Sequence, residues 1–178
     1  SFSANTTVAS FATSPDCATA PVLSCNALQT YTLQPLQGAW NTCNSTAYSQ
    51  EKVYAFTPSV SGVHTLFSSV TSGFVFFSWK AASAGCNANG WTCMGNTNTL
   101  NTTQFSFGPL TAGTTYYILA DANAFSQPIS GSFRIECPVC NGPTASSVAS
   151  TTPSSASVVW SGNATVLEYG PQGFMPGT

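Results

Sequence analysis

The chain has 178 residues, of which three are Lys or Arg and five are Asp or Glu, so its net charge of −2 reflects a scarcity of charged side chains. With 4% charged residues there is no basic surface to neutralise phosphates, which argues against nucleic-acid binding. Hydrophobic residues make up 43% of the chain, enough to bury a core, so we expect a folded protein. One His and five carboxylates leave few groups for acid–base chemistry, and we expect neither enzyme activity nor a cofactor.

Taken in chain order, the first predicted element is a helical turn at residues 14–20. Beyond it, short runs rich in Val, Ile, Phe, Tyr and Thr, separated by Gly, Pro, Ser and Asn, predict strands. These strands are expected at 52–57, 63–67, 74–79, 104–107, 115–120 and 132–136. In the last of them Phe133 and Ile135 share one face and Arg134 and Glu136 the other, as a half-solvated antiparallel strand requires. The sequence therefore predicts an all-β fold, with antiparallel sheets packed as a β-sandwich or jelly roll.

The chain is expected to divide into three parts. Residues 1–13 form an extended N-terminal segment and residues 14–140 the β-sandwich, and residues 141–178 are a second module. The boundary is the linker signature Asn141-Gly142-Pro143, after which strands are predicted at 145–150, 155–161 and 165–169. The second module has too few residues to close a sandwich without help from another segment.

Seven cysteines in a chain with almost no Lys indicate an oxidising compartment, in which disulfides link loops. We therefore expect a secreted, extracellular protein associated with the cell surface. The chain begins at Ser1 and has no apolar stretch long enough to cross a bilayer, so we expect a signal peptide to have been removed and no membrane insertion.

The spacing of the cysteines suggests how they pair. Cys86 and Cys93 stand at the ends of a short loop with Asn89-Gly90 as its turn, so we pair them with each other. The Cys-Pro-Val-Cys string ending at Cys140 has no second such string to complete a zinc site, and a structural role is favoured. An odd count leaves one thiol over, for an intermolecular bridge, a partner cysteine beyond these residues or a buried free thiol. The other expected pairs are Cys25 with Cys43, and Cys17 with Cys137 or Cys140.

Two tryptophans are candidate contact residues. Trp91 is expected at the tip of the loop closed by Cys86 and Cys93, where its ring could be a stacking platform for a sugar. The alternative is that the ring packs back over the loop or against a neighbouring subunit. Trp40 lies in the early loop that Cys25 and Cys43 are expected to bridge, and is a second possible contact.

Neither His64 nor Asp121 is expected to form a reactive site. His64 lies in a predicted strand, which favours a core imidazole hydrogen-bonded to a hydroxyl group. Asp121 and Asn123 offer two oxygens where a Ca²⁺ site needs six to eight, so we expect Asp121 to cap a turn. We predict no catalytic or metal-binding residues.

Several stretches resemble a known family. Residues 51–58 and 61–66, then 110–121 and 131–137, are similar to the pre-peptidase C-terminal (PPC) β-sandwich of large secreted and surface proteins of Bacteroidetes-like bacteria. The resemblance covers roughly residues 14–140. Within it the loops carry Asn, Ser and Thr where family members usually carry Asp. The family has no catalytic residues to carry over, so the resemblance implies an adhesive, substrate-binding or structural role.

The C-terminal segment has a resemblance of its own. The string from Leu167 to Thr178 is similar to the third-strand region of fibronectin type III modules, which are immunoglobulin-like and often follow PPC domains in the same bacteria. The resemblance implies that residues 141–178 are part of such a module.

Two functions from different classes fit these features. The first is a structural or adhesive subunit that binds copies of itself or other surface proteins and glycans, because low charge permits close packing without self-repulsion. The second is an accessory module that holds substrate or glycan for a larger secreted hydrolase. For the first, segment 5–11, with Val8 and Phe11, has an alternating pattern and no Pro and is a candidate donor strand for the C-terminal module of another copy. The alternative is that further strands of a longer protein complete that module in the same chain. Donor and acceptor at opposite ends of the chain predict a head-to-tail filament.

Overall fold

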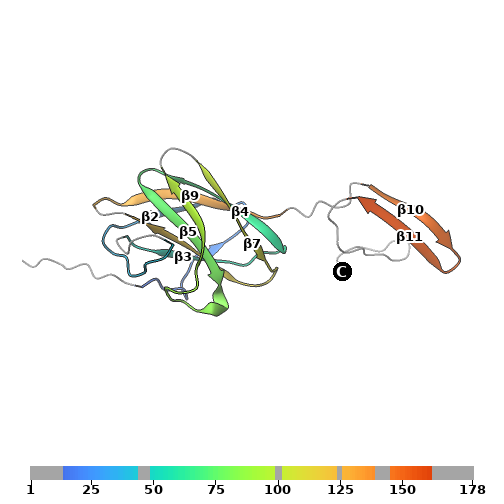
Figure 1. Ribbon diagram of the computed structural model, residues 1–178, viewed down its shortest axis with the longest axis horizontal. Helices are drawn as coiled ribbons and strands as arrows, with labels where there is room; N and C mark the ends of the chain where they lie inside the picture. The colour runs from blue at the N-terminus through green and yellow to red at the C-terminus, as the bar shows by residue number, and fades with distance from the viewer. Residues whose placement is uncertain (1–13, 44–48, 99–101, 124–125, 139–144, 162–178) are drawn as a thin grey trace, which may run out of the picture. The chain divides into compact units, whose positions relative to one another are not determined.

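In the computed structural model, the described residues are 14–43, 49–98, 102–123, 126–138 and 145–161. The chain divides into two compact units, Ser1–Pro138 and Val139–Thr178, and each is considered by itself. In the first unit the strands are β1 (Val22–Leu23), β2 (Gln29–Leu33), β3 (Lys52–Phe56), β4 (Gly62–Val70), β5 (Phe74–Ala81), β6 (Thr92–Asn98), β7 (Thr103–Leu110), β8 (Tyr116–Ala122) and β9 (Ile129–Glu136), with a 3₁₀ turn η1 (Ala82–Ala84) after β5 (Figure 1). Among the described residues no helix is long and apolar enough to cross a membrane.

The first unit is a β-sandwich, so the predicted fold class is confirmed. Its strands form a five-stranded sheet in the order β1-β3-β8-β5-β6 and a four-stranded sheet in the order β2-β9-β4-β7. Every pairing in these two sheets is antiparallel except that of β1 with β3, which is parallel. Aromatic rings from the two sheets meet between them: Phe133 of β9 lies 5.0 Å from Tyr54 of β3 and 5.4 Å from Phe77 of β5, centroid to centroid.

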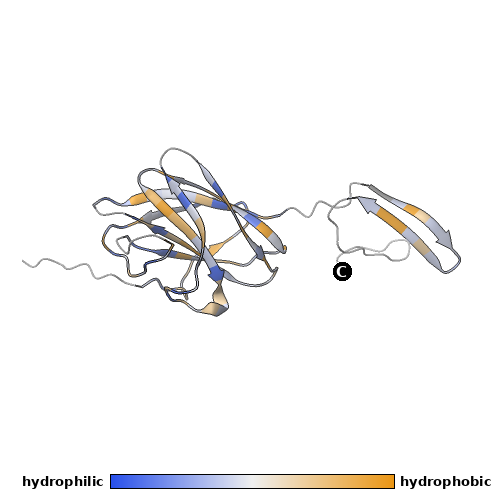
Figure 2. Cartoon of the chain, in the orientation of Figure 1, coloured by the Kyte–Doolittle hydropathy of each residue, from blue (hydrophilic) through white to orange (hydrophobic). Residues whose placement is uncertain are grey.

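Alternation along the strands sets which side chains enter the core. In β4, His64, Leu66 and Ser68 are buried while the residues between them are more exposed, and hydrophobic and hydrophilic positions adjoin along the strands in Figure 2. In β9 the inward positions include Gly131, which lies opposite Tyr31 of β2. A glycine at this position leaves room for the Tyr31 ring, whose hydroxyl oxygen would stand 2.5 Å from an added Cβ. A side chain at position 131 would therefore displace either the Tyr31 ring or the Ser69 backbone.

The six strands predicted in the first unit are all present, in some cases with longer bounds. Three further strands were not expected: β1, β2 and β6. The sequence of β6 is Thr-Cys-Met-Gly-Asn-Thr-Asn, in which Thr favours strands but Gly95, Asn96 and Asn98 are residue types depleted in them. Pairing with β5 along six register positions, rather than propensity, makes β6 a strand.

The predicted helical turn at residues 14–20 is not a helix. The Asp16 carboxylate instead accepts hydrogen bonds from the Ala18 N–H (2.9 Å) and the Thr19 hydroxyl (2.9 Å). An Asp side chain that binds the backbone two residues ahead makes a local turn, which competes with helix formation. Residues 14–21 therefore lead into β1 as a turn and a bend.

The predicted cysteine pairs are wrong in their partners. The structure has disulfides Cys17–Cys86, Cys25–Cys137 and Cys43–Cys93, with Cα–Cα distances of 5.9, 5.6 and 5.5 Å. The expected pairs Cys86–Cys93 and Cys25–Cys43 do not form, and Cys17 binds neither Cys137 nor Cys140; the pairing of Cys140 itself lies outside the described residues. Closeness in sequence did not predict the pairs, because each of these cysteines is bonded to one at least 50 residues away in the chain. Three disulfides are typical of proteins in an oxidising environment.

The second unit contains an antiparallel hairpin of β10 (Ala145–Thr152) and β11 (Ser155–Ser161). Val148 lies opposite Val158, and a bulge follows between Val148 and Ser150. Both strands were predicted; the third, at 165–169, lies outside the described residues.

Candidate functional site

His64 is a core residue, as predicted. The side chain is fully buried, and its ring packs edge-on against Phe56 with centroids 5.5 Å apart. Its Nδ1 donates to the backbone carbonyl of Gly62 at 3.0 Å, where a hydroxyl partner was expected. Burial disfavours the imidazolium and lowers the pKa of His64, and the Gly62 carbonyl only partly offsets this effect. His64 is therefore part of the packing between the sheets.

The buried His64 predicts a loss of stability in mild acid. Its folded-state pKa lies below the ordinary 6.5, so as the pH falls below 6.5 the unfolded chain takes up a proton that the folded chain does not. The His64 contribution to stability is therefore present above pH 6.5 and is lost as the pH falls through the folded-state pKa. We expect the free energy of unfolding in urea to decrease between pH 7.5 and pH 5.5, by at most about 1.4 kcal/mol per pH unit from this group.

A His64→Leu variant tests this expectation, because it replaces the buried imidazole with an apolar side chain and removes the titration. Its unfolding free energy should vary less with pH than that of the unchanged chain. Glu51, whose pKa burial raises, acts in the opposite sense and stays present in both proteins. Equal pH slopes in the two proteins would show that His64 does not titrate with folding.

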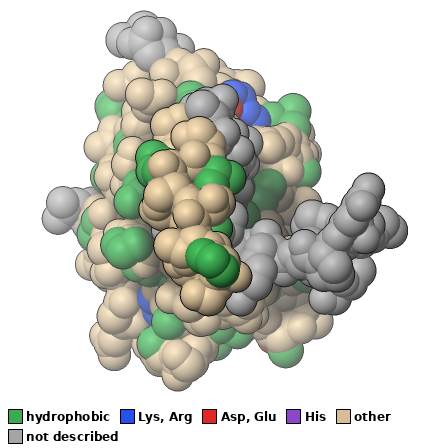
Figure 3. Space-filling model, turned by 90° about the vertical axis from the view of Figure 1, so that its right-hand side faces the viewer, with side chains coloured by type: hydrophobic (Ala, Val, Ile, Leu, Met, Phe, Trp, Pro, Cys, Tyr) green, Lys and Arg blue, Asp and Glu red, His purple; other side chains and the backbone are tan. Residues whose placement is uncertain are grey.

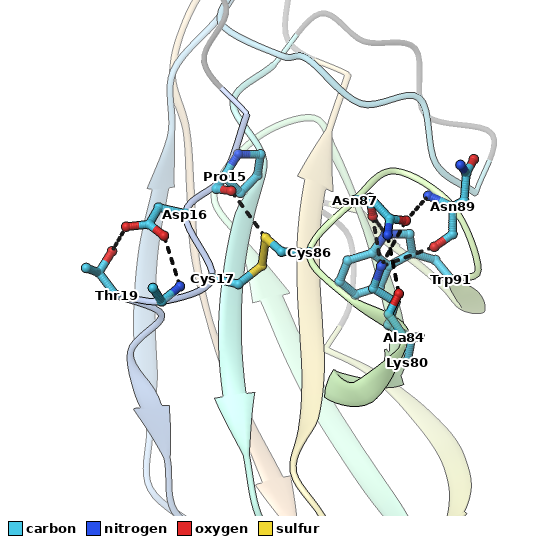
Figure 4. The surroundings of a disulfide bond; sticks show 11 residues. Pro15, Asp16, Cys17, Thr19, Lys80, Ala84, Cys86, Asn87, Asn89 and Trp91 are labelled. Carbon is cyan, nitrogen blue, oxygen red and sulfur yellow. Dashed lines mark hydrogen bonds between the residues drawn. A yellow bond between two sulfur atoms is a disulfide. The ribbon is translucent and has the colours of Figure 1, made fainter.

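Trp91 packs back over its own loop, which was the alternative to an outward platform. Its ring lies 6.0 Å from that of Trp40, and its indole N–H donates to the Asn87 carbonyl at 2.9 Å. The ammonium of Lys80 lies 4.6 Å from the centre of the Trp91 ring (Figure 4). The Cys86–Cys93 bridge expected to hold this loop does not form, and the Trp91 ring is instead held by Trp40, Lys80 and the Asn87 carbonyl.

Lys80 organises this loop and was not recognised from the sequence. The side chain is buried, and its Nζ donates to the carbonyls of Asn87 at 2.9 Å and Asn89 at 3.1 Å (Figure 4). Burial lowers the pKa of Lys80. The Cys17–Cys86 disulfide lies beside the loop, so the two devices together fix residues 86–91 against the sandwich.

Two buried carboxylates fix the long segment between β2 and β3. The Glu51 carboxylate accepts hydrogen bonds from the backbone N–H groups of Ala39 and Trp40, and its burial raises its pKa against the effect of these bonds. Asp121 accepts a hydrogen bond from the Thr42 hydroxyl at 3.1 Å. Asp121 lies inside β8 and is buried, so the prediction that it caps a turn is wrong. Trp40 is buried as a result, in a small cluster with Cys17, Val53 and Leu119.

The edge of β3 borders a surface groove. Its volume is about 520 Å³, and its walls are residues 14–16 and 19–21 on one side and residues 50–53 on the other. β1 pairs with only the last two residues of β3, Ala55 and Phe56. The groove therefore lies beside the first residues of β3.

The hairpin of the second unit carries exposed apolar side chains. Val148 is 61% exposed, Val159 54% and Trp160 38%. On the face of the molecule in Figure 3, hydrophobic side chains stand among uncharged polar ones and few charged side chains appear. Exposed apolar side chains on neighbouring strands favour contact with a further element.

The described residues contain no group of three or more His, Cys, Asp or Glu side chains placed to hold a metal ion. They define a disulfide-linked all-β protein whose distinctive surfaces are a groove beside β3 and an apolar hairpin. No protein-family model matches the chain, and no curated protein matches it significantly.

Proposed function

We propose that this protein is a non-catalytic, secreted structural or adhesive subunit that assembles with copies of itself at the cell surface. Assembly proceeds by strand donation: residues 5–11 of one copy add a strand to an open sheet edge of the next. Because the donating and accepting surfaces differ, the contact is head-to-tail and extends as a filament.

The observation that carries this proposal is the exposure of Val148, Val159 and Trp160 on the β10–β11 hairpin, the described part of the second unit. Isolated surface hydrophobic residues are ordinary, but several on one short hairpin favour an interaction surface. The scarcity of charge also supports it, because neighbouring copies can pack closely without repulsion. The resemblance to PPC domains, whose family has no catalytic residues, supports the non-catalytic part of the proposal.

The assembly is tested with the purified full-length chain, in which we expect filaments in negative-stain images and a mass by light scattering that rises with concentration. Deleting residues 1–11, or replacing Val8 with proline, should leave a monomer, because proline lacks the N–H that a donated strand needs. Ala4→Pro, outside the donor segment, is the matched control and should still assemble. Unchanged assemblies after deletion, or a monodisperse full-length monomer at high concentration, would contradict strand donation.

A second candidate function is an accessory glycan-binding module of a larger secreted hydrolase. A hollow of about 390 Å³ on the four-stranded sheet favours it. Hydroxyl groups line this hollow, with Thr32 and Ser130 2.8 Å apart and Ser69 and Ser132 3.1 Å apart, and a neutral polyhydroxylated ligand could replace such hydrogen bonds. Calorimetric binding of neutral oligosaccharides by the monomer, lost in Thr30→Trp, would favour this function over the first.

A further inference from the structure

Two asparagines in the loop after η1 differ in how their side chains are held. The Asn87 amide is fixed at both ends: its Oδ1 accepts a hydrogen bond from the Asn89 N–H at 2.9 Å, and its Nδ2 donates to the Ala84 carbonyl at 3.3 Å. The Asn89 side chain is exposed and, within the described part of the chain, makes no hydrogen bond. Figure 4 shows it directed away from Lys80. Of the two, the Asn89 amide is therefore free to turn toward the backbone.

The backbone that follows Asn89 is open to reaction. Gly90 is exposed, no atom beyond its chain neighbours lies within 4 Å of the position that a Cβ would take, and among the described residues its N–H donates no hydrogen bond. A backbone nitrogen can attack the side-chain Cγ of a preceding asparagine, and a side chain on the attacking residue hinders this approach. Glycine has no side chain and rotates freely, whereas Asn87 is followed by Ala88. The loop therefore contains one reactive asparagine beside one protected asparagine.

We propose that Asn89 deamidates spontaneously and becomes isoaspartate, whose new carboxylate binds the ammonium of Lys80. The Gly90 nitrogen forms a bond to the Asn89 Cγ and gives up its proton to solvent, while the Nδ2 group takes a proton and leaves as ammonia. The five-membered imide then takes up one water molecule and opens. In balance, an amide and water become a carboxylic acid and ammonia, with no change of oxidation state. This modification is independent of the proposed assembly.

Lys80 selects which of the two imide carbonyls water attacks. Attack at the Cγ carbonyl gives aspartate, and attack at the former backbone carbonyl of residue 89 gives isoaspartate. In the structure this backbone carbonyl accepts a hydrogen bond from the Lys80 Nζ at 3.1 Å. A donor at this distance stabilises the negative charge that develops on the carbonyl oxygen during the attack. The ammonium therefore favours isoaspartate.

The product gives the buried Lys80 a counter-ion. The Lys80 Nζ donates to the carbonyls of Asn87 and Asn89 and lies 3.4 Å from the Asn87 Oδ1, and all of these oxygens are neutral. Within the described residues the ion pair is Arg134–Glu136, so Lys80 has no carboxylate partner there. A buried charge is stabilised by pairing, and in isoaspartate the former backbone carbonyl of residue 89 becomes a carboxylate. A hydrogen bond to a neutral oxygen is thus replaced by an ion pair.

The surrounding contacts keep the ammonium in place while the chain reacts. The Cys17–Cys86 disulfide holds the start of the loop, and beyond Gly90 the Trp91 indole N–H donates to the Asn87 carbonyl at 2.9 Å. Isoaspartate adds one methylene group to the backbone between residues 86 and 91, and Gly90 can absorb the change in direction. The reaction therefore alters the loop locally and adds one negative charge to it.

The test follows the folded, unchanged chain during incubation at mildly alkaline pH. Peptide mapping by mass spectrometry, with electron-transfer fragmentation to distinguish isoaspartate from aspartate, measures each asparagine. We expect residue 89 to convert mainly to isoaspartate while Asn87, in the same peptide, stays an amide. Asn89→Gln is the matched control and should keep its amide, because its imide would need a six-membered ring, which closes more slowly.

The role of Lys80 is measured by the ratio of isoaspartate to aspartate at residue 89. We expect this ratio to be at least about threefold higher in the folded chain than in urea with reductant, where Lys80 is no longer held near residue 89. Lys80→Met should lower the folded ratio to the urea value, whereas Lys52→Met, which removes a lysine outside the loop, should leave it unchanged. If Lys80→Met does not fold, the comparison with urea decides by itself.

The outcomes bear on different parts of the inference. An unmodified Asn89 in the folded chain, or an Asn87 that reacts equally fast, would overturn the site. A ratio that is the same in the folded chain and in urea would overturn the role of Lys80. None of these measurements depends on assembly, so a monomeric chain would refute the proposed function and leave this inference intact.

Discussion

Replacing Gly131 with alanine is expected to lower the free energy of unfolding by about 3 kcal/mol, a large effect for one added methyl group. Gly131 lies in β9 with Tyr31 of β2 and Val70 of β4 at its flanking register positions. A Cβ there would overlap the carbonyl oxygen of Ser69 and stand 2.5 Å from the Tyr31 hydroxyl oxygen. The first is backbone in a paired strand and the second belongs to a buried ring, so neither can move freely. Urea unfolding measures the effect.

Ser132→Ala is the matched control for Gly131→Ala. Ser132 is the next residue in β9, on the other face, and its hydroxyl bonds to that of Ser69 at 3.1 Å. We expect its loss to cost about 1 kcal/mol or less. If Gly131→Ala were no more destabilising than Ser132→Ala, Tyr31 would have to occupy a different position from the one described.

Removing the Cys25–Cys137 disulfide is expected to cost about 4 to 5 kcal/mol of unfolding free energy. The two cysteines are 112 residues apart in sequence, so the link greatly restricts the unfolded chain. The Cys25→Ala/Cys137→Ala double variant, compared with the unchanged chain in urea, measures the loss. Removing Cys43–Cys93, 50 residues apart, should cost roughly 0.7 kcal/mol less in the same treatment.

Non-reducing peptide mapping of the unchanged chain is the check on these disulfides. It should recover peptides linked as Cys17–Cys86, Cys25–Cys137 and Cys43–Cys93. Recovery of a peptide linked through Cys86 and Cys93 would contradict this pairing.

The sequence predicts those strands whose side chains alternate between core and solvent. In β9, Phe133 and Ile135 are buried while Arg134 and Glu136 form an ion pair of 2.7 Å on the outer face, as the pattern indicates. β6 was missed because Gly95, Asn96 and Asn98 are residue types that disfavour strands, whereas β2 was missed although Gln-Thr-Tyr-Thr-Leu alternates and its Thr and Tyr favour strands. Tyr31 and Leu33 are the only large apolar residues of β2 and become core residues through pairing with β9.

The surroundings of the candidate sites were harder to predict, because they depend on contacts between distant segments. In the sequence Lys80 lies near the end of a predicted strand. No local pattern indicates that its ammonium donates to the carbonyls of Asn87 and Asn89. In the sequence Glu51 precedes a predicted strand, which indicates a solvent-exposed charge. Its carboxylate instead accepts hydrogen bonds from the backbone N–H groups of Ala39 and Trp40. Pro21, which has no backbone N–H, is visible in the sequence. That it lies next to the groove depends on the parallel pairing of β1 with β3, which the sequence does not predict.

The Cys25–Cys137 disulfide also decides how the subunit responds to pulling force. In the proposed filament, load that enters near residue 25 and leaves near residue 137 would cross the sulfur–sulfur bond and bypass the 112-residue stretch between them. Fully extended, that stretch would release on the order of 370 Å of chain, and the covalent link withholds it. In that filament the stretch between Cys25 and Cys137 would not lengthen under load, and the chain would yield outside it.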